Sequence, residues 1–181
     1  WVQDAWVEPS DIEVYVAAVE QHRLHTRVNL AQRADPATWR DQVAAFVATR
    51  AVIRELGAER LSAETVKFFV DGVIESHTAA LIDPYADRPD EHGLPNWSAA
   101  ELAEAAAPFD EEGFQLHIHA IGDAANRSAL DAIEAATRAG EPRERHHVIA
   151  HVAVLDPADV SRFAELNIIA NFEPYWAQCD A

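Results

Sequence analysis

Patterns typical of strands and helices alternate along nearly the whole chain, and this alternation constrains the fold more than any other feature. Short segments rich in β-branched and aromatic residues predict strands, and longer segments with apolar residues at helical spacing separate them. We expect five strands, the first four each followed by a helix, at residues 25–31, 65–72, 114–120, 146–151 and 167–172. Such a rhythm indicates βαβ units and a parallel sheet.

Capping residues predict where the helices begin. Ser, Asp and Asn accept hydrogen bonds from the free N–H groups of a first helical turn, and proline fits the first helical position. The first helix should follow Ser10 and the second should run to about Gly57. Two further helices should end near Gly113 and Gly140. The other expected starts are Asp35 before Pro36, Ser98 with Glu101 as a capping box, and Asp156 before Pro157.

Two architectures fit a parallel α/β chain, a doubly wound sheet and a (β/α)8 barrel. A doubly wound dinucleotide-binding sheet would carry a glycine-rich turn after its first strand, and no predicted strand here ends in one. Five strands cannot close an eight-stranded barrel, so a barrel requires an incomplete chain. Because the sequence opens on Trp1 and contains no methionine, we expect residues 1–181 to be one incomplete barrel domain.

The composition excludes several partners. The formal charge of −17 lacks the basic footprint on which nucleic-acid binding depends. The apolar runs are too short for a membrane span, so no membrane partner is expected. Cys179 is the single cysteine, which favours a reducing, cytoplasmic location. We expect a small-molecule substrate, and a homo-oligomer is compatible with the sequence.

Residues able to do chemistry collect at the predicted strand ends, where parallel α/β folds place their sites. Lysine occurs once among 14 basic residues, at position 67. Arginine cannot replace a lysine that must act as a neutral amine. Histidine binds metals through a neutral ring nitrogen, and a histidine-rich site without thiolates favours zinc. The strand-end residues are Lys67, Asp71, His117, His119, His151, Asn171 and Glu173.

A long connection follows the strand that contains Lys67, from Gly72 to Trp97. Loops of this length inside a compact domain are commonly functional. Aromatic residues on it, and one after the last strand, are candidates to face an apolar acyl or aryl group of a substrate. These candidates are His77, Tyr85, Trp97 and Trp176.

Three segments, VKFFVDGVIESHTAAL, LHIHAIGDAANRSALDAIE and VIAHVAVLDPADVSRFAELNIIANFEPYWA, carry a resemblance to a known family. Together they resemble the YtcJ-type branch of the metal-dependent amidohydrolase superfamily, amidohydrolase family 3, which is similar to N-substituted formamide deformylase. The resemblance covers most of residues 60–181, whereas the first 60 residues hold no diagnostic motif.

The resemblance implies a (β/α)8 TIM barrel, of which this chain would hold roughly strands 3 to 7, with one or two divalent metals, of which zinc is the expected one. Lys67 matches the lysine that is carbamylated in related members and bridges two metals, and is the expected catalytic residue. His119 and His151 match the ligands on the fifth and sixth barrel strands. His117, one layer deeper, and Asp71 are expected to support these ligands. His117 and His119 resemble a first-strand HxH pair, but the AIGD continuation favours the fifth strand.

Two family features have no match in the chain, the first-strand HxH pair and the eighth-strand aspartate that handles the proton of the attacking water. About three of six expected ligands are present, so we expect the isolated segment neither to bind metal tightly nor to turn over substrate. For the complete protein the resemblance implies metal-dependent hydrolysis of a non-peptide carbon–nitrogen bond. The alternatives are an inactive binding or regulatory protein on this scaffold, and a doubly wound domain without metal.

Overall fold

A single sheet of parallel strands organises the chain, whose computed structural model describes residues 1–173. Every neighbouring pair is parallel, and the six strands follow one another in chain order. They are β1 (Val2–Val7), β2 (Val28–Arg33), β3 (Leu61–Phe69), β4 (Gln115–Ala120), β5 (Val148–His151) and β6 (Ile169–Asn171). The sequence pattern predicted the last five and missed β1, whose side chains are mostly exposed or half-buried.

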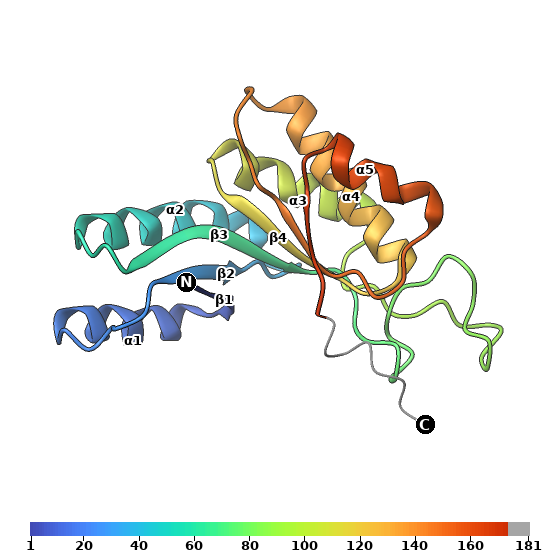
Figure 1. Ribbon diagram of the computed structural model, residues 1–181, viewed down its shortest axis with the longest axis horizontal. Helices are drawn as coiled ribbons and strands as arrows, with labels where there is room; N and C mark the ends of the chain where they lie inside the picture. The colour runs from blue at the N-terminus through green and yellow to red at the C-terminus, as the bar shows by residue number, and fades with distance from the viewer. Residues whose placement is uncertain (174–181) are drawn as a thin grey trace.

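The helices lie on the outer side of a curled sheet (Figure 1). They are α1 (Pro9–Glu20), α2 (Trp39–Glu55), α3 (Ala99–Glu111), α4 (Asp123–Ala139) and α5 (Val160–Glu165), with a 3₁₀ turn at Pro157–Asp159. A parallel sheet that curls in strand order, with helices on its convex side, is part of a (β/α)8 barrel, which confirms the predicted fold class. Within residues 1–173, no helix combines the length and hydropathy that crossing a membrane requires.

Two of the predicted helix starts are confirmed and two need correction. The Ser98 hydroxyl accepts from the Glu101 N–H at 3.2 Å, and Asp156 accepts from the Ala158 N–H at 2.8 Å. The first helix begins at Pro9, not after Ser10, because the Asp11 carboxylate accepts the Glu8 N–H at 2.8 Å.

The second correction concerns Asp35. Its carboxylate accepts the Ala37 N–H at 2.9 Å within a turn, and helix α2 begins only at Trp39. The proline signal therefore marks the turn before the helix instead of its first residue.

The two faces of the sheet differ in chemistry. On the convex face, Phe68, Ile118 and Ile149 are fully buried in the apolar core beneath helices α2 to α4. On the concave face, polar side chains bond across neighbouring strands: Asn29 donates to Thr65 at 2.7 Å, and Thr65 donates to Gln115 at 2.9 Å. Because strand side chains alternate, residues 67, 117 and 119 point to the concave side.

Asp71 anchors the long connection between β3 and α3. Its carboxylate accepts the N–H groups of Ala80 and Gly122 at 2.9 Å and that of Ile121 at 3.0 Å. One buried carboxylate therefore ties the 72–97 loop to the turn that follows β4. In Figure 1 this loop, in green, extends beyond the ends of the strands.

Candidate metal centre

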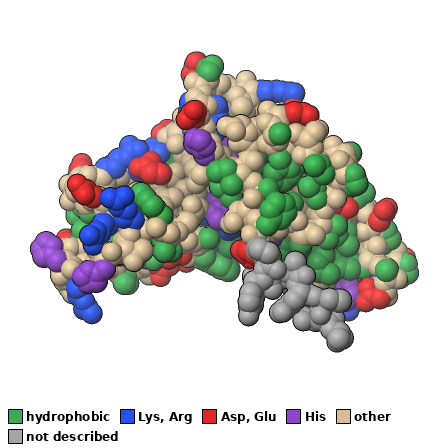
Figure 2. Space-filling model, viewed as in Figure 1, with side chains coloured by type: hydrophobic (Ala, Val, Ile, Leu, Met, Phe, Trp, Pro, Cys, Tyr) green, Lys and Arg blue, Asp and Glu red, His purple; other side chains and the backbone are tan. Residues whose placement is uncertain are grey.

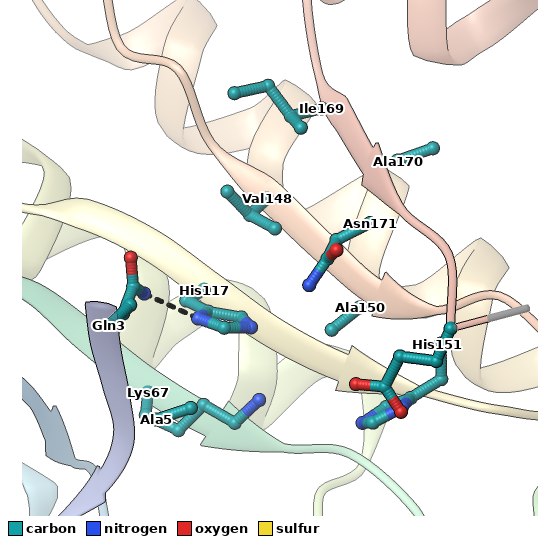
Figure 3. A pocket seen from close by; sticks show the side chains of 11 residues that line it. Gln3, Ala5, Lys67, His117, Val148, Ala150, His151, Ile169, Ala170 and Asn171 are labelled. Carbon is teal, nitrogen blue, oxygen red and sulfur yellow. Dashed lines mark hydrogen bonds and ion pairs between the residues drawn. The ribbon is translucent and has the colours of Figure 1, made fainter. Parts of the chain in front are cut away.

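Strand pairing brings the sequence-predicted residues together on the concave face. Lys67 is the register partner of His117, and Phe69 is the partner of His119. Figure 3 shows Lys67 and His117 pointing into one cavity from neighbouring strands, with His151 across from them. The cavity measures about 500 Å³, and its lining also includes Gln3, Asn171 and Glu173. Histidine side chains are visible where this face of the molecule is hollowed (Figure 2).

His151 reaches the site through an unusual backbone conformation. Its register partner is Ala120, which belongs to the buried convex core. A regular strand would thus direct His151 toward the helices. Instead its φ is +79°, and its ring lies 4.5 Å from that of His119 in an edge-to-face contact. Six described residues other than glycine have a positive φ, four of them histidines, so this conformation turns the His151 ring inward but does not by itself mark a site.

Both histidine rings are oriented by neighbouring oxygens. His119 Nε2 lies 3.2 Å from the Gly72 carbonyl and 3.4 Å from the Asp71 carboxylate. His151 Nδ1 lies 3.1 Å from the Glu173 carboxylate. Such oxygen partners commonly fix the tautomer and the tilt of metal-binding imidazoles. Burial, and next the charge of His119, lower the pKa of His151, which favours the neutral ring that a metal requires.

Lys67 is buried with 2% of its surface exposed. Burial lowers the pKa of its amine to about 8, although the Glu173 carboxylate acts in the opposite direction. The ammonium nitrogen lies 4.8 Å from the centroid of the Phe69 ring. Within residues 1–173, no carboxylate forms an ion pair with it. Lys67 is thus a desolvated amine held at the end of a strand.

His117 lies one layer below His119 and contacts β1. The side-chain nitrogen of Gln3 is 2.6 Å from His117 Nδ1. Burial, then the nearby Lys67, His151 and His119, lower the pKa of His117 to about 3, so the ring is neutral. Among the described residues, His117 Nε2 has no hydrogen-bond partner.

The donor set fits a divalent metal only in part. Two imidazoles in contact and a buried amine supply ligand types that zinc accepts. Among residues 1–173, no three His, Cys, Asp or Glu side chains are grouped so that they could hold an ion. The described residues alone therefore form no complete metal site, and the roles of Lys67, His119 and His151 as metal ligands stay a prediction.

Three of the four predicted substrate-facing residues, His77, Tyr85 and Trp97, are not part of the lining of this cavity. His77 contacts Tyr85 at 4.8 Å between ring centroids and pairs with Asp87 at 2.8 Å. The Tyr85 hydroxyl donates to the Ala79 carbonyl at 2.8 Å. Trp97 packs on Phe68 in the core, although it also borders a second hollow beside His119. Trp176 lies outside the described residues. Their contact with substrate stays a prediction.

Two contributors to the site were not among the predicted site residues. Gln3 belongs to the strand that the sequence pattern missed, and it reaches His117 across 114 positions in the sequence. Glu173 was noted only as a strand-end residue, and no local signal pairs it with His151. The ANFEP segment that carries it belongs to the family resemblance, so its position was the available hint.

The fold and the site together define part of an α/β barrel whose reactive side chains lie at the C-terminal ends of its strands. Residues 2–179 match the model of the amidohydrolase family, and the chain belongs to that family. Two solved metal-dependent hydrolases share the fold. The one from Pyrococcus horikoshii has a TM-score of 0.79 at 24% identity, covering 97% of this chain and 33% of that one. The one from Pyrococcus furiosus has a TM-score of 0.73 at 24% identity, covering 96% and 34%.

Three named relatives share more sequence. The protein LONG AFTER FAR-RED 3 of Arabidopsis thaliana is 37% identical over 109 residues, 60% of this chain and 19% of the relative. The exoenzymes regulatory protein AepA of Pectobacterium carotovorum is 36% identical over 120 residues, 65% and 25%. YtcJ of Bacillus subtilis, named as an amidohydrolase, is 32% identical over 127 residues, 67% and 23%. The chain thus spans about a quarter or less of these relatives.

Proposed function

We propose that the complete protein containing this chain is a hydrolase that cleaves a non-peptide carbon–nitrogen bond, such as an amide, formamide or cyclic amide, with a metal-activated water. The observation that carries the proposal is the edge-to-face contact of His119 and His151 at the ends of two strands. Lys67, buried and with a lowered pKa, lines the same cavity as His151. The metal-dependent hydrolases that share the fold support it.

Lys67, His119 and His151 would hold one or two divalent ions together with ligands from the rest of the barrel, and zinc suits nitrogen and oxygen donors. When bound, such a metal lowers the pKa of its water and polarises the scissile carbonyl. The chain's own contribution is orientation. Gly72 and Asp71 hold His119 Nε2, which leaves Nδ1 as the nitrogen for a metal, and Glu173 holds the ring of His151.

Lys67 would act as a carbamate. Its neutral amine attacks the carbon of carbon dioxide, a nitrogen–carbon bond forms, one C=O electron pair moves to oxygen, and the amine proton passes to water. Only the neutral amine reacts, and a pKa of about 8 makes that form far more abundant near neutrality than in an exposed lysine. The product is an anionic oxygen ligand, which arginine could not supply.

A regulatory protein without catalysis is the second candidate, because AepA is named as a regulatory protein. The complete sequence distinguishes the two. An HxH pair on the first barrel strand and an aspartate on the eighth favour the enzyme, and their absence favours the regulator.

The test is Lys67→Ala in the complete protein, assayed on a panel of N-acyl and cyclic amides beside elemental analysis for metal. Losing a residue that supports a metal ligand typically costs 10–100-fold in activity or affinity, so losing the ligand itself should cost more than about a hundredfold. Short carboxylates added to the medium should restore part of the activity. Arg40→Ala, at an exposed side chain, is the control. Wild-type activity in the Lys67 variant would refute the role of Lys67 in holding the metal.

A further inference from the structure

His117 is a buried polar residue that the proposed function does not use. It is 6% exposed, and its Nε2 atom, fully enclosed, has no hydrogen-bond partner among the described residues. Leaving a buried polar group unpaired costs about 1–3 kcal/mol. Such atoms are rare in native proteins and need an explanation.

Gln3 determines what kind of partner His117 needs. The amide nitrogen of Gln3, a donor, lies 2.6 Å from Nδ1. Nδ1 must therefore accept, and the proton of the neutral ring lies on Nε2. A protonated ring nitrogen cannot bind a metal. His117 Nε2 is thus an N–H donor that requires an acceptor.

Lys67 is the residue best placed to carry that acceptor. The two residues are register partners on neighbouring strands, so their side chains leave the sheet side by side on the same face. Both line the cavity and point into it (Figure 3). The unmodified ammonium group offers only donors, whereas a carbamate extends the side chain and ends in two acceptor oxygens.

We propose that His117 donates a hydrogen bond from Nε2 to a carbamate on Lys67 and thereby acts as a positioning residue for that modification. The inference rests on the proposed role of Lys67. A hydrogen bond to an anionic oxygen is shorter and stronger than one between neutral groups. It would stabilise the carbamate and fix its plane while both oxygens keep lone pairs for metal. The series of hydrogen bonds would thus run from Gln3 on β1 to His117 on β4, and from there to Lys67 on the neighbouring strand β3.

The test measures carbamate directly in the complete, metal-depleted protein. Wild type and variants are equilibrated with increasing ¹³C-bicarbonate, and the lysine carbamate is quantified by ¹³C NMR. Lys67→Ala gives the zero level. His117→Gln retains an amide N–H near the position of Nε2, whereas His117→Asn is too short and His117→Phe has no donor. His146→Phe, at a mostly exposed histidine, is the matched control, and circular dichroism checks folding.

We expect His117→Phe and His117→Asn to need at least about tenfold more bicarbonate than wild type for half-maximal carbamate, and His117→Gln and His146→Phe to stay within about threefold. Unchanged titrations in Phe and Asn variants of a protein that does form carbamate would overturn the role of His117 and leave that of Lys67 intact. Equal loss in all three His117 variants would overturn the hydrogen bond in favour of packing. If wild type forms no carbamate, the role of Lys67 fails, and that of His117 with it.

Discussion

The two ends of the parallel sheet each hold a buried histidine among charged residues, yet the two clusters differ in completeness. At the N-terminal end, Asp110, Arg143, Arg145 and His147 form what we call the closed cluster. The Asp110 carboxylate contacts Arg143 at 2.6 Å, Arg145 at 2.9 Å and His147 Nε2 at 3.1 Å. The Leu116 N–H donates to His147 Nδ1 at 3.0 Å. Both nitrogens of this histidine therefore have partners.

At the C-terminal end, Lys67 has no carboxylate in contact among the described residues, and His117 has one nitrogen without a partner. Completed polar networks make a fold rigid and specific, whereas incomplete ones concentrate at sites of function. The comparison teaches that burial and charge alone do not mark a site. A buried polar atom without a hydrogen-bond partner is the better mark of a site. Three experiments test this distinction.

The largest effect is expected from Asp110→Ala. The change leaves the guanidinium groups of Arg143 and Arg145 without their carboxylate, and Arg145 is almost fully buried. Removing one partner of a buried ion pair typically costs about 3–5 kcal/mol. Urea unfolding of the complete protein, depleted of metal and bicarbonate, should show this loss. Under the same conditions Lys67→Met, which removes an unpaired buried amine, should change the free energy of unfolding by less than about 1 kcal/mol. Equal losses in both variants would erase the contrast between the two ends.

The second-largest effect is a loss of stability in acid, caused by protonation of Asp110 in the closed cluster. Burial raises the pKa of Asp110, but hydrogen bonds from His147 and Arg145 and the charge of Arg143 outweigh it and lower that pKa to about 2. Because the folded pKa lies below the unfolded value near 3.8, the carboxylate stabilises the fold above about pH 4. The contribution, about 2 kcal/mol, disappears as pH falls through about 2. The stability gap between wild type and Asp110→Asn should narrow over this window, and a gap independent of pH would contradict the assignment.

The smallest expected effect is the difference in stability between variants of His147 and of His117. His147→Phe leaves the Leu116 N–H without an acceptor and should cost about 1–3 kcal/mol. His117→Phe replaces a group whose Nε2 is already unpaired, so the unfolding free energy should change by less than about 1 kcal/mol. Thermal unfolding midpoints of the two variants, measured side by side in protein depleted of metal and bicarbonate, provide the check. A larger loss at His117 would show that its hydrogen bond to Gln3 stabilises the fold more than we infer.

Sequence patterns predicted what is local and missed what is distant. The strands around Lys67, His119 and His151 are rich in β-branched and aromatic residues, and the Ser98 capping box spans four residues, so both were readable. Strand β1 has no buried apolar run except at Val7, and the pattern did not identify it.

Non-local contacts explain the remaining omissions. The partners of Asp110 lie 33 to 37 positions away in the sequence, and Gln3 lies 114 positions from His117. Neither spacing has a periodicity that a sequence pattern can reveal. The left-handed backbone of His151 was equally hidden, because no local sequence pattern marks where a residue other than glycine adopts it. The family motif singled out this histidine, but only the structure shows how its ring turns inward.

The hydrogen bonds of the Asp71 carboxylate determine which part of the 72–97 loop is fixed to the barrel. The Ala80 N–H donates to the Asp71 carboxylate, and a Cβ added at Gly122 would collide with the Ala80 carbonyl. At the other end, the Asn96 N–H is bonded to the Val70 carbonyl. The stretch at 83–95 is therefore held at both ends, and from within it the Tyr85 hydroxyl also bonds to the Ala79 carbonyl. Replacing this stretch should leave the orientation of the His119 ring unchanged, because Asp71 and Gly72 lie outside it and contact His119 Nε2.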